Sequence, residues 1–223
     1  MVRQKICKLF FGVVPAFSLL ISQKVLHAQE VPFRPSVSFE KLSSIYTISY
    51  GDPHAPLHVT EYFSLSCPKC LTFIRRDFPS IQARYIDKGK VYWTFHPDPA
   101  DLLTLQAMVC FEKLSSQGKQ VLIETLAHHP RASFRKGCFK MQEYMDALGK
   151  PQPLLHDLSF LEKSQAFQKA FTYLKQPTVP AELPTIEING KIHQEFPSLQ
   201  WLDKTFAELL KRGSRHHQTS NSR

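Results

Sequence analysis

Two cysteines three positions apart, Cys67 and Cys70, stand between a run of β-forming residues and the start of a helical pattern. The run, residues 57–63, is mostly apolar and predicts a buried strand. The helical pattern starts at Pro68, because proline is tolerated in the first turn of a helix. A cysteine at such a junction faces the positive end of the helix dipole, which stabilises a thiolate. The local sequence therefore predicts a strand–turn–helix unit with Cys67 at the corner.

A Cys-x-x-Cys pair serves in three ways: as a structural bridge, as part of a zinc site, or as a redox centre. A disulfide that closes so short a loop is strained and therefore a poor structural bridge, but the same strain suits reversible disulfide exchange. A zinc site would need Cys110 and Cys138 as further ligands, and the spacing from Cys70 to Cys110 is long for a compact zinc module. We therefore expect a redox pair and no metal site.

The surrounding pattern predicts a β-α-β unit. An edge strand is expected at 45–48, followed by the strand at 57–63. The helix after it runs to near Gly89 and contains Pro79, which should kink it. A further strand follows at 91–95, so that the two inner strands should be parallel with a right-handed crossover.

The second half of the chain predicts helices first and then a hairpin. Residues 101–175 show no strand pattern, and the expected helices lie near 101–116, 119–127, 138–148 and 159–175. Two short strands, 185–188 and 191–193, flank Asn189-Gly190, a strong hairpin signal. An amphipathic helix at 199–210 completes a β-β-α unit. The fold class that this order predicts is α/β, a thioredoxin fold with an inserted helical domain.

These elements divide the chain into five parts. We expect a signal peptide (1–28), a leader (29–44), a thioredoxin-fold domain (45–99 and 176–212), an inserted helical domain (100–175) and a disordered basic tail (213–223).

The first 28 residues have the pattern of an export signal. A basic segment precedes the 13-residue apolar stretch 9–21, and Ala28 offers a small residue at the cleavage point. An uncleaved anchor is the alternative, although the stretch is short for a membrane span. The net charge of +9 is concentrated in this segment and in the tail from residue 211 onward, and the near-neutral remainder does not predict nucleic-acid binding. We expect a soluble periplasmic protein.

The segment from Glu61 to Cys70 resembles the active site of the DsbA family of exported thiol:disulfide oxidoreductases. Residues 51–56 resemble the segment that precedes the active-site strand in that family, and residues 183–191 resemble its cis-proline strand and hairpin. The resemblance spans about residues 45–210 and is only topological in the helical insert.

The resemblance implies a role for each site residue. Cys67 is the exposed nucleophile, and Cys70 is the buried resolving cysteine. Pro68 and Lys69 contact substrate, and the Lys69 cation weakly favours the Cys67 thiolate.

A cis proline opposite the nucleophile is also implied. Pro184 fits by its spacing from Asn189, and Pro180 is the rival candidate. The Leu183 backbone would pair with an extended substrate peptide, although Leu183 departs from the Thr or Val typical of the family.

Glu61 is expected either at the surface of the strand end or beneath the cysteines as a proton acceptor, as the resemblance implies. Cys110 and Cys138 are candidates for a structural disulfide, with buried free thiols as the alternative. The pairs His128-His129 and His216-His217 are expected at the surface. Four aromatic residues are expected in the core: Phe63, Phe73, Trp93 and Phe95.

The predicted activity is oxidation of reduced exported proteins by a monomer that needs no cofactor. The resemblance implies a membrane-bound reoxidant similar to DsbB. A reductase or isomerase of the same fold remains open, as does an exported chaperone-like binding protein with a structural disulfide.

Overall fold

A five-stranded sheet organises the part of the chain that the computed structural model describes. That part comprises residues 44–98, 102–128, 134–150, 157, 159, 162–174, 182–193 and 198–220. The strands are β1 (Ile48–Tyr50), β2 (Leu57–Phe63), β3 (Val91–Pro97), β4 (Thr185–Ile188) and β5 (Lys191–His193). Their order across the sheet is β1-β3-β2-β4-β5. The predicted signal peptide lies outside the described residues.

The strand pairings confirm the predicted thioredoxin fold. Strand β2 runs parallel to β3, from Leu57 opposite Val91 to Phe63 opposite Pro97, and antiparallel to β4. Strand β3 therefore continues two residues beyond the expected end at 95, because its last residues pair with the end of β2. The hairpin between β4 and β5 turns at Asn189 and Gly190, whose φ angles of 47° and 81° are those that a type I′ turn requires.

The first strand begins later than the sequence predicts. Residues 44–46 form a helical turn, and β1 starts only at Ile48. The Lys119 ammonium group donates hydrogen bonds to the carbonyl oxygens of Ser44, Ile45 and Thr47 at 2.9, 2.5 and 3.3 Å. These carbonyls are thus bound by a side chain from a helix far along the chain. Strand propensity, which depends on neighbouring residues, cannot predict such a tertiary contact.

The helix after Cys67 is broken rather than kinked. It comprises α2 (Pro68–Arg76), α3 (Phe78–Ile81) and a π-helical turn, η1 (Gln82–Ile86). The interruption falls at Asp77, two residues before Pro79. Proline lacks an N–H group and its ring crowds the carbonyl four residues earlier, so the regular ladder ends before Pro79 is reached.

An aromatic cluster joins this helical segment to one face of the sheet. Phe73 and Phe78 of the helices contact Trp93 of β3, and Phe78 also contacts Phe95 at a ring separation of 4.8 Å. None of these side chains is more than 2% exposed, and Phe63 is also buried. The expectation that Phe63, Phe73, Trp93 and Phe95 are core residues is confirmed.

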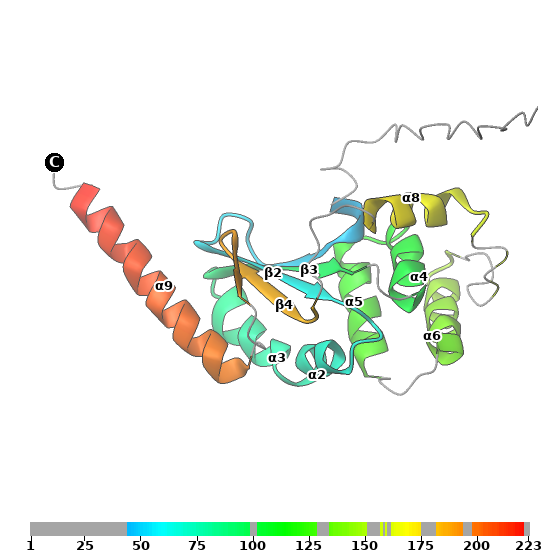
Figure 1. Cartoon of the computed structure of the whole chain (residues 1–223), viewed down its shortest axis with the longest axis horizontal. Helices are drawn as coiled ribbons and strands as arrows, with labels where there is room; N and C mark the ends of the chain where they lie inside the picture. Colours follow the sequence, from blue (N-terminus) through cyan, green and yellow to red (C-terminus); the bar gives the residue numbers. More distant parts are fainter. Residues whose placement is uncertain are drawn as a thin grey trace, which may run out of the picture. The chain divides into compact units, whose positions relative to one another are not determined.

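Between β3 and β4, four helices have bounds within the described residues. They are α4 (Leu102–Phe111), α5 (Ser116–Ala127), α6 (Phe134–Ala147) and α8 (Gln165–Leu174). Figure 1 shows them grouped beside the sheet, as the inserted helical domain of the predicted fold requires. Helix α4 is buried from Leu103 to Phe111, and it approaches α6 so closely that a Cβ atom on Gly137 would lie 2.7 Å from Leu103.

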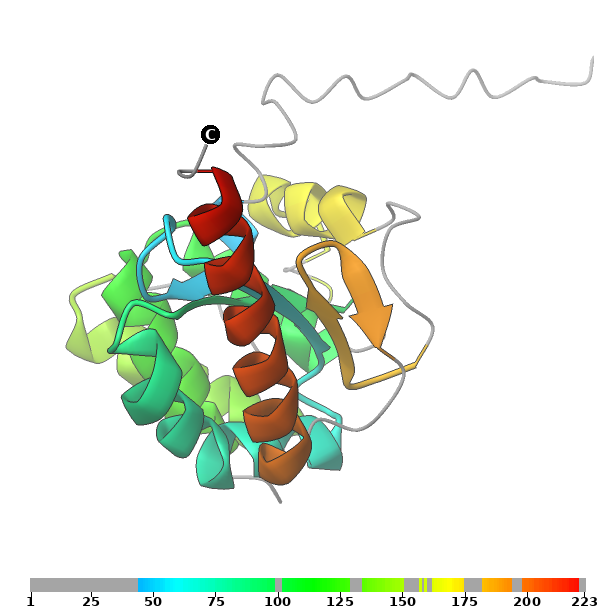
Figure 2. The ribbon, with the colours of Figure 1, turned by 90° about the vertical axis from the view of Figure 1, so that its left-hand side faces the viewer.

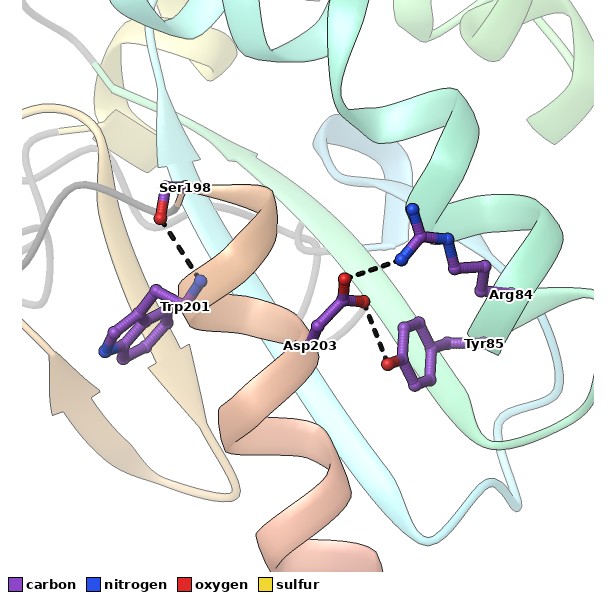
Figure 3. Close-up of polar contacts among 5 residues, drawn as sticks. All are labelled: Arg84, Tyr85, Ser198, Trp201 and Asp203. Carbon is purple, nitrogen blue, oxygen red and sulfur yellow. Dashed lines mark hydrogen bonds and ion pairs between the residues drawn. The ribbon is translucent and has the colours of Figure 1, made fainter.

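Helix α9 (Leu199–Ser220) follows the hairpin and crosses in front of the sheet in Figure 2. Its start is capped by Ser198, whose hydroxyl accepts a hydrogen bond from the Trp201 N–H. The Asp203 carboxylate binds Arg84 at 2.5 Å and the Tyr85 hydroxyl at 2.9 Å, which ties α9 to η1 (Figure 3). The helix continues past the expected end at 210 and includes residues 213–220, for which the sequence predicts a disordered tail. No proline stands there to stop it.

Candidate functional site

Cys67 is the N-cap residue of α2. Its backbone is extended (φ −85°, ψ 109°), and its sulfur accepts a hydrogen bond from the Cys70 N–H at 3.3 Å. The side chain is partly exposed, whereas Cys70, one turn into the helix, is fully buried. One sulfur is therefore accessible to a partner and the other is held beneath it, as the sequence predicts.

The pKa values of the two thiols are shifted in opposite directions. The Cys70 thiol and the backbone N–H groups of Cys70 and Lys69 donate to the Cys67 sulfur and lower the pKa of Cys67 to about 6, against the opposing effect of burial. The positive charge of Lys69 acts in the same direction as the smallest contribution. The pKa of Cys70 is raised, because this thiol donates to Cys67, is buried and lies near Glu61. At neutral pH the pair therefore exists as a Cys67 thiolate and a Cys70 thiol.

Glu61 lies in β2 with its side chain fully buried, and its carboxyl interacts electrostatically with Cys67 and Cys70. Neither of its carboxyl oxygens has a hydrogen-bond partner among the described residues. Burial and the nearby Cys67 charge raise its pKa well above the usual value. Of the two positions that the sequence allows for Glu61, the structure shows the buried one.

Leu183 brings a second segment to the nucleophile. The Cys67 Sγ atom lies 3.9 Å from the Leu183 carbonyl oxygen. The Leu183–Pro184 peptide bond is cis, as expected for Pro184, whereas the rival Pro180 lies outside the described residues. Strand β4 starts at the next residue, Thr185, so its pairing with β2 places this backbone beside the corner where β2 ends.

Ser64 is a site residue that was not among those predicted from the sequence. Its hydroxyl accepts a hydrogen bond from the Ser66 N–H at 3.0 Å, and its carbonyl accepts one from the Cys67 N–H at 3.2 Å. Its own backbone also interacts with the Cys70 sulfur. A serine directly after a strand, three residues before a helix cap, is a local signal for such a turn and could have identified it.

Cys110 and Cys138 are buried free thiols in the structure. The Cys138 thiol donates to the Gln106 side-chain oxygen at 2.6 Å, and burial raises the pKa of Cys110 to about 12. The structural disulfide between them stays a prediction. Within the described ranges, no group of three or more His, Cys, Asp or Glu side chains is placed to hold a metal ion.

A family model described as thioredoxin matches residues 43–207, which is most of the sequence and includes both cysteines and Pro184. The chain belongs to the thioredoxin family. No curated protein matches it. No helix in the described part of this thioredoxin-family chain is long and apolar enough to cross a membrane.

Several solved structures share this fold. BdbD from Bacillus subtilis is 21% identical with a TM-score of 0.57, and the match covers 74% of this chain and 94% of BdbD. α-DsbA1 from Wolbachia pipientis is 21% identical with a TM-score of 0.56, over 74% and 92% of the two chains. A protein-disulfide isomerase from Novosphingobium aromaticivorans is 16% identical with a TM-score of 0.57, over 73% and 97%. The resemblance to DsbA proteins stated from the sequence is thereby confirmed at the level of the fold.

Proposed function

We propose that this chain is an exported thiol:disulfide oxidoreductase that introduces disulfide bonds into reduced exported proteins. The observation that carries the proposal is the partly exposed Cys67 thiol at the N-cap of α2, which has a lowered pKa and faces the Leu183 carbonyl. Stabilisation of the reduced thiolate makes the corresponding disulfide a stronger oxidant. A pKa of about 6 for Cys67 thus favours transfer of the disulfide to substrate.

The first step is attack of a substrate thiolate on the Cys67 sulfur of the Cys67–Cys70 disulfide. A bond forms between the substrate and Cys67, the Cys67–Cys70 bond breaks, and its electron pair stays on the Cys70 sulfur. Because the raised pKa of Glu61 keeps this buried carboxyl protonated, it can supply the proton that Cys70 then takes up. The Leu183 backbone beside Cys67 offers main-chain pairing to an extended substrate peptide.

In the second step, another substrate thiolate attacks the substrate sulfur of the mixed disulfide. The substrate leaves oxidised, and Cys67 leaves as a thiolate. A thiol of low pKa is a good leaving group, which again suits Cys67. The protein has gained two electrons, held as a Cys67 thiolate and a Cys70 thiol. Because its pKa is raised, the Glu61 carboxylate regains a proton from solvent in the reduced protein, and during reoxidation it relays the Cys70 proton outward.

The compartment, the oligomeric state and the partners are also part of the proposal, and they rest on the DsbA resemblance and the predicted signal peptide. The protein acts as a periplasmic monomer, its substrates are reduced exported proteins, and a membrane-bound partner takes the two electrons from Cys67 and Cys70. No cofactor and no nucleic acid take part.

The decisive experiment measures oxidation of a reduced, unfolded protein with several cysteines by the preoxidised full chain. The Cys67→Ala variant should lose this activity, and the Cys110→Ala variant, the same change at a buried cysteine outside the site, should retain it. Activity in Cys67→Ala would contradict the proposal. If Cys67→Ala still binds unfolded chains as the wild type does, and neither protein oxidises them, the chaperone-like alternative is correct.

The reduction potential distinguishes the oxidase from a reductase of the same fold. Equilibration of the Cys67–Cys70 pair with glutathione should give a value near that of a strong oxidant, about −120 mV. A value near that of thioredoxin, about −270 mV, would assign the chain to the reductases instead.

A further inference from the structure

The loop between β2 and α2 carries four consecutive backbone N–H groups, those of residues 64–67. The Ser64 backbone interacts with the Cys70 sulfur, the Ser66 N–H donates to the Ser64 hydroxyl, and the Cys67 N–H donates to the Ser64 carbonyl. These three contacts stay within the loop and the helix that follows it. The fourth N–H group, that of Leu65, is bound from elsewhere in the chain.

The Leu65 N–H donates to the hydroxyl oxygen of Thr104 at 2.8 Å. Thr104 lies in the first turn of α4, 39 residues further along the chain and in the helical insert. Both residues are buried, with Thr104 1% and Leu65 3% exposed. Water therefore cannot replace the hydroxyl easily, and a buried amide without a partner is costly.

Resting on the proposed function, we propose that Thr104 is a positioning residue, whose hydroxyl ties the helical insert to the active-site loop and thereby holds Cys67 at the cap of α2. Leu65 directly follows Ser64, the residue that contacts both cysteines. Fixing the Leu65 amide fixes the Ser64–Leu65 peptide unit and, with it, the Ser64 carbonyl to which the Cys67 N–H donates. Without the tie, the loop relaxes and the Cys67 sulfur spends less time within reach of the Cys70 N–H.

The test compares Thr104→Val, which keeps the shape and removes the acceptor, with Thr104→Ser, which keeps the hydroxyl. Thr125→Val is the matched control, because the Thr125 hydroxyl donates a hydrogen bond within its own helix, to the Val121 carbonyl. The readout is the pKa of Cys67 in the reduced full chain, followed by thiolate absorbance near 240 nm. We expect Thr104→Val to raise this pKa by at least about half a unit, a threefold change in the ionisation constant. Thr104→Ser and Thr125→Val should match the wild type.

A folded Thr104→Val protein with the wild-type Cys67 pKa would overturn the proposal, even if its melting temperature were lower. Should that variant not fold, amide exchange in the wild type decides the same point. The Leu65 amide should exchange at least ten times more slowly than an unprotected amide. Exchange at the unprotected rate would show that the Leu65–Thr104 hydrogen bond is not formed and would overturn the proposal. A wild-type Cys67 pKa near 9 would contradict the proposed function, whereas the difference between Thr104→Val and wild type still decides the role of Thr104.

Discussion

The Cys67 sulfur lies 3.9 Å from the carbonyl oxygen of Leu183, although 116 residues separate them in the sequence. The approach results from the antiparallel pairing of β2 and β4, in which Tyr62 stands opposite Thr185. A nucleophilic sulfur and an extended backbone thus meet at one corner of the sheet. In the proposed reaction, a protein substrate presents its cysteine and its main chain there together.

The acidity of Cys67 provides the first prediction. In the reduced protein, thiolate absorbance should titrate with a pKa of about 6, because donors at the helix N-terminus stabilise the anion. The Lys69→Gln variant should raise this value by less than about one unit, since the Lys69 charge is the smallest contribution. The exposed Lys88→Gln change is the control and should leave the titration unchanged. Titration of the wild type near the value of a free thiol would contradict the cap geometry.

Glu61→Gln should stabilise the reduced protein at neutral pH. The pKa of Glu61 is raised in the folded state, so the folded protein disfavours the carboxylate, and stability falls as pH rises above the unfolded pKa of about 4.5. The gain from Glu61→Gln should therefore be absent below pH 4 and should grow with pH, by about 1.4 kcal/mol for each unit of the raised pKa that is passed.

Urea unfolding between pH 4 and pH 8 measures this dependence. The exposed Glu208→Gln variant is the matched control and should change the free energy of unfolding by no more than about 0.5 kcal/mol. A pH-independent effect of Glu61→Gln would show that the carboxyl is not held neutral in the folded protein.

Two glycines with positive φ angles should respond differently to alanine. Gly51 has φ +91°, and a Cβ atom there would lie 2.8 Å from both the Ile86 side chain and the Val91 carbonyl oxygen. Gly89 has φ +64° and no heavy atom within 4 Å of the same position. Gly51→Ala should therefore cost more than about 2 kcal/mol of unfolding free energy, and Gly89→Ala about 1 kcal/mol. Equal losses in urea unfolding would show that the crowding at Gly51 is relieved by movement.

Lys119→Met should weaken the attachment of the first residues of the domain. The Lys119 side chain is 5% exposed, and its ammonium group satisfies three carbonyls around Ile45. A methionine fills similar space but donates no hydrogen bond, so about 1–3 kcal/mol of stability should be lost in urea unfolding. Lys140→Met, at an exposed ion pair with Glu143, should cost at most about 0.5 kcal/mol. If both variants lose the same amount, the buried contacts of Lys119 contribute nothing specific.

Elements with a strong local pattern were predicted at their observed positions. The run 57–63 is β2, and Asn189-Gly190 is the turn of the hairpin. Apolar periodicity and turn chemistry act over a few residues, so neighbouring side chains suffice to specify them. Pro79 also predicted a disturbance in the helix, and the interruption lies two residues before it, at Asp77.

Elements that depend on distant contacts were predicted less well. The sequence places a strand at 45–48, where the ammonium group of Lys119 binds a helical turn instead. The loop residue Leu65 carries no motif, and its partner Thr104 lies in a helix whose place in the fold no local pattern specifies. Contacts of this kind arise only when the insert docks on the sheet.

The sequence by itself determined the chemistry of this protein: a Cys67–Cys70 pair between a strand and a helix, followed by a proline-led hairpin. Only the tertiary structure decided how that chemistry is tuned. It buried Glu61 with no hydrogen-bond partner among the described residues, set Leu183 against Cys67 and brought Thr104 to the loop between β2 and α2. The physical reason is that acidity depends on burial and on donors within a few ångströms, and these distances are set by sheet register and helix packing across the whole chain.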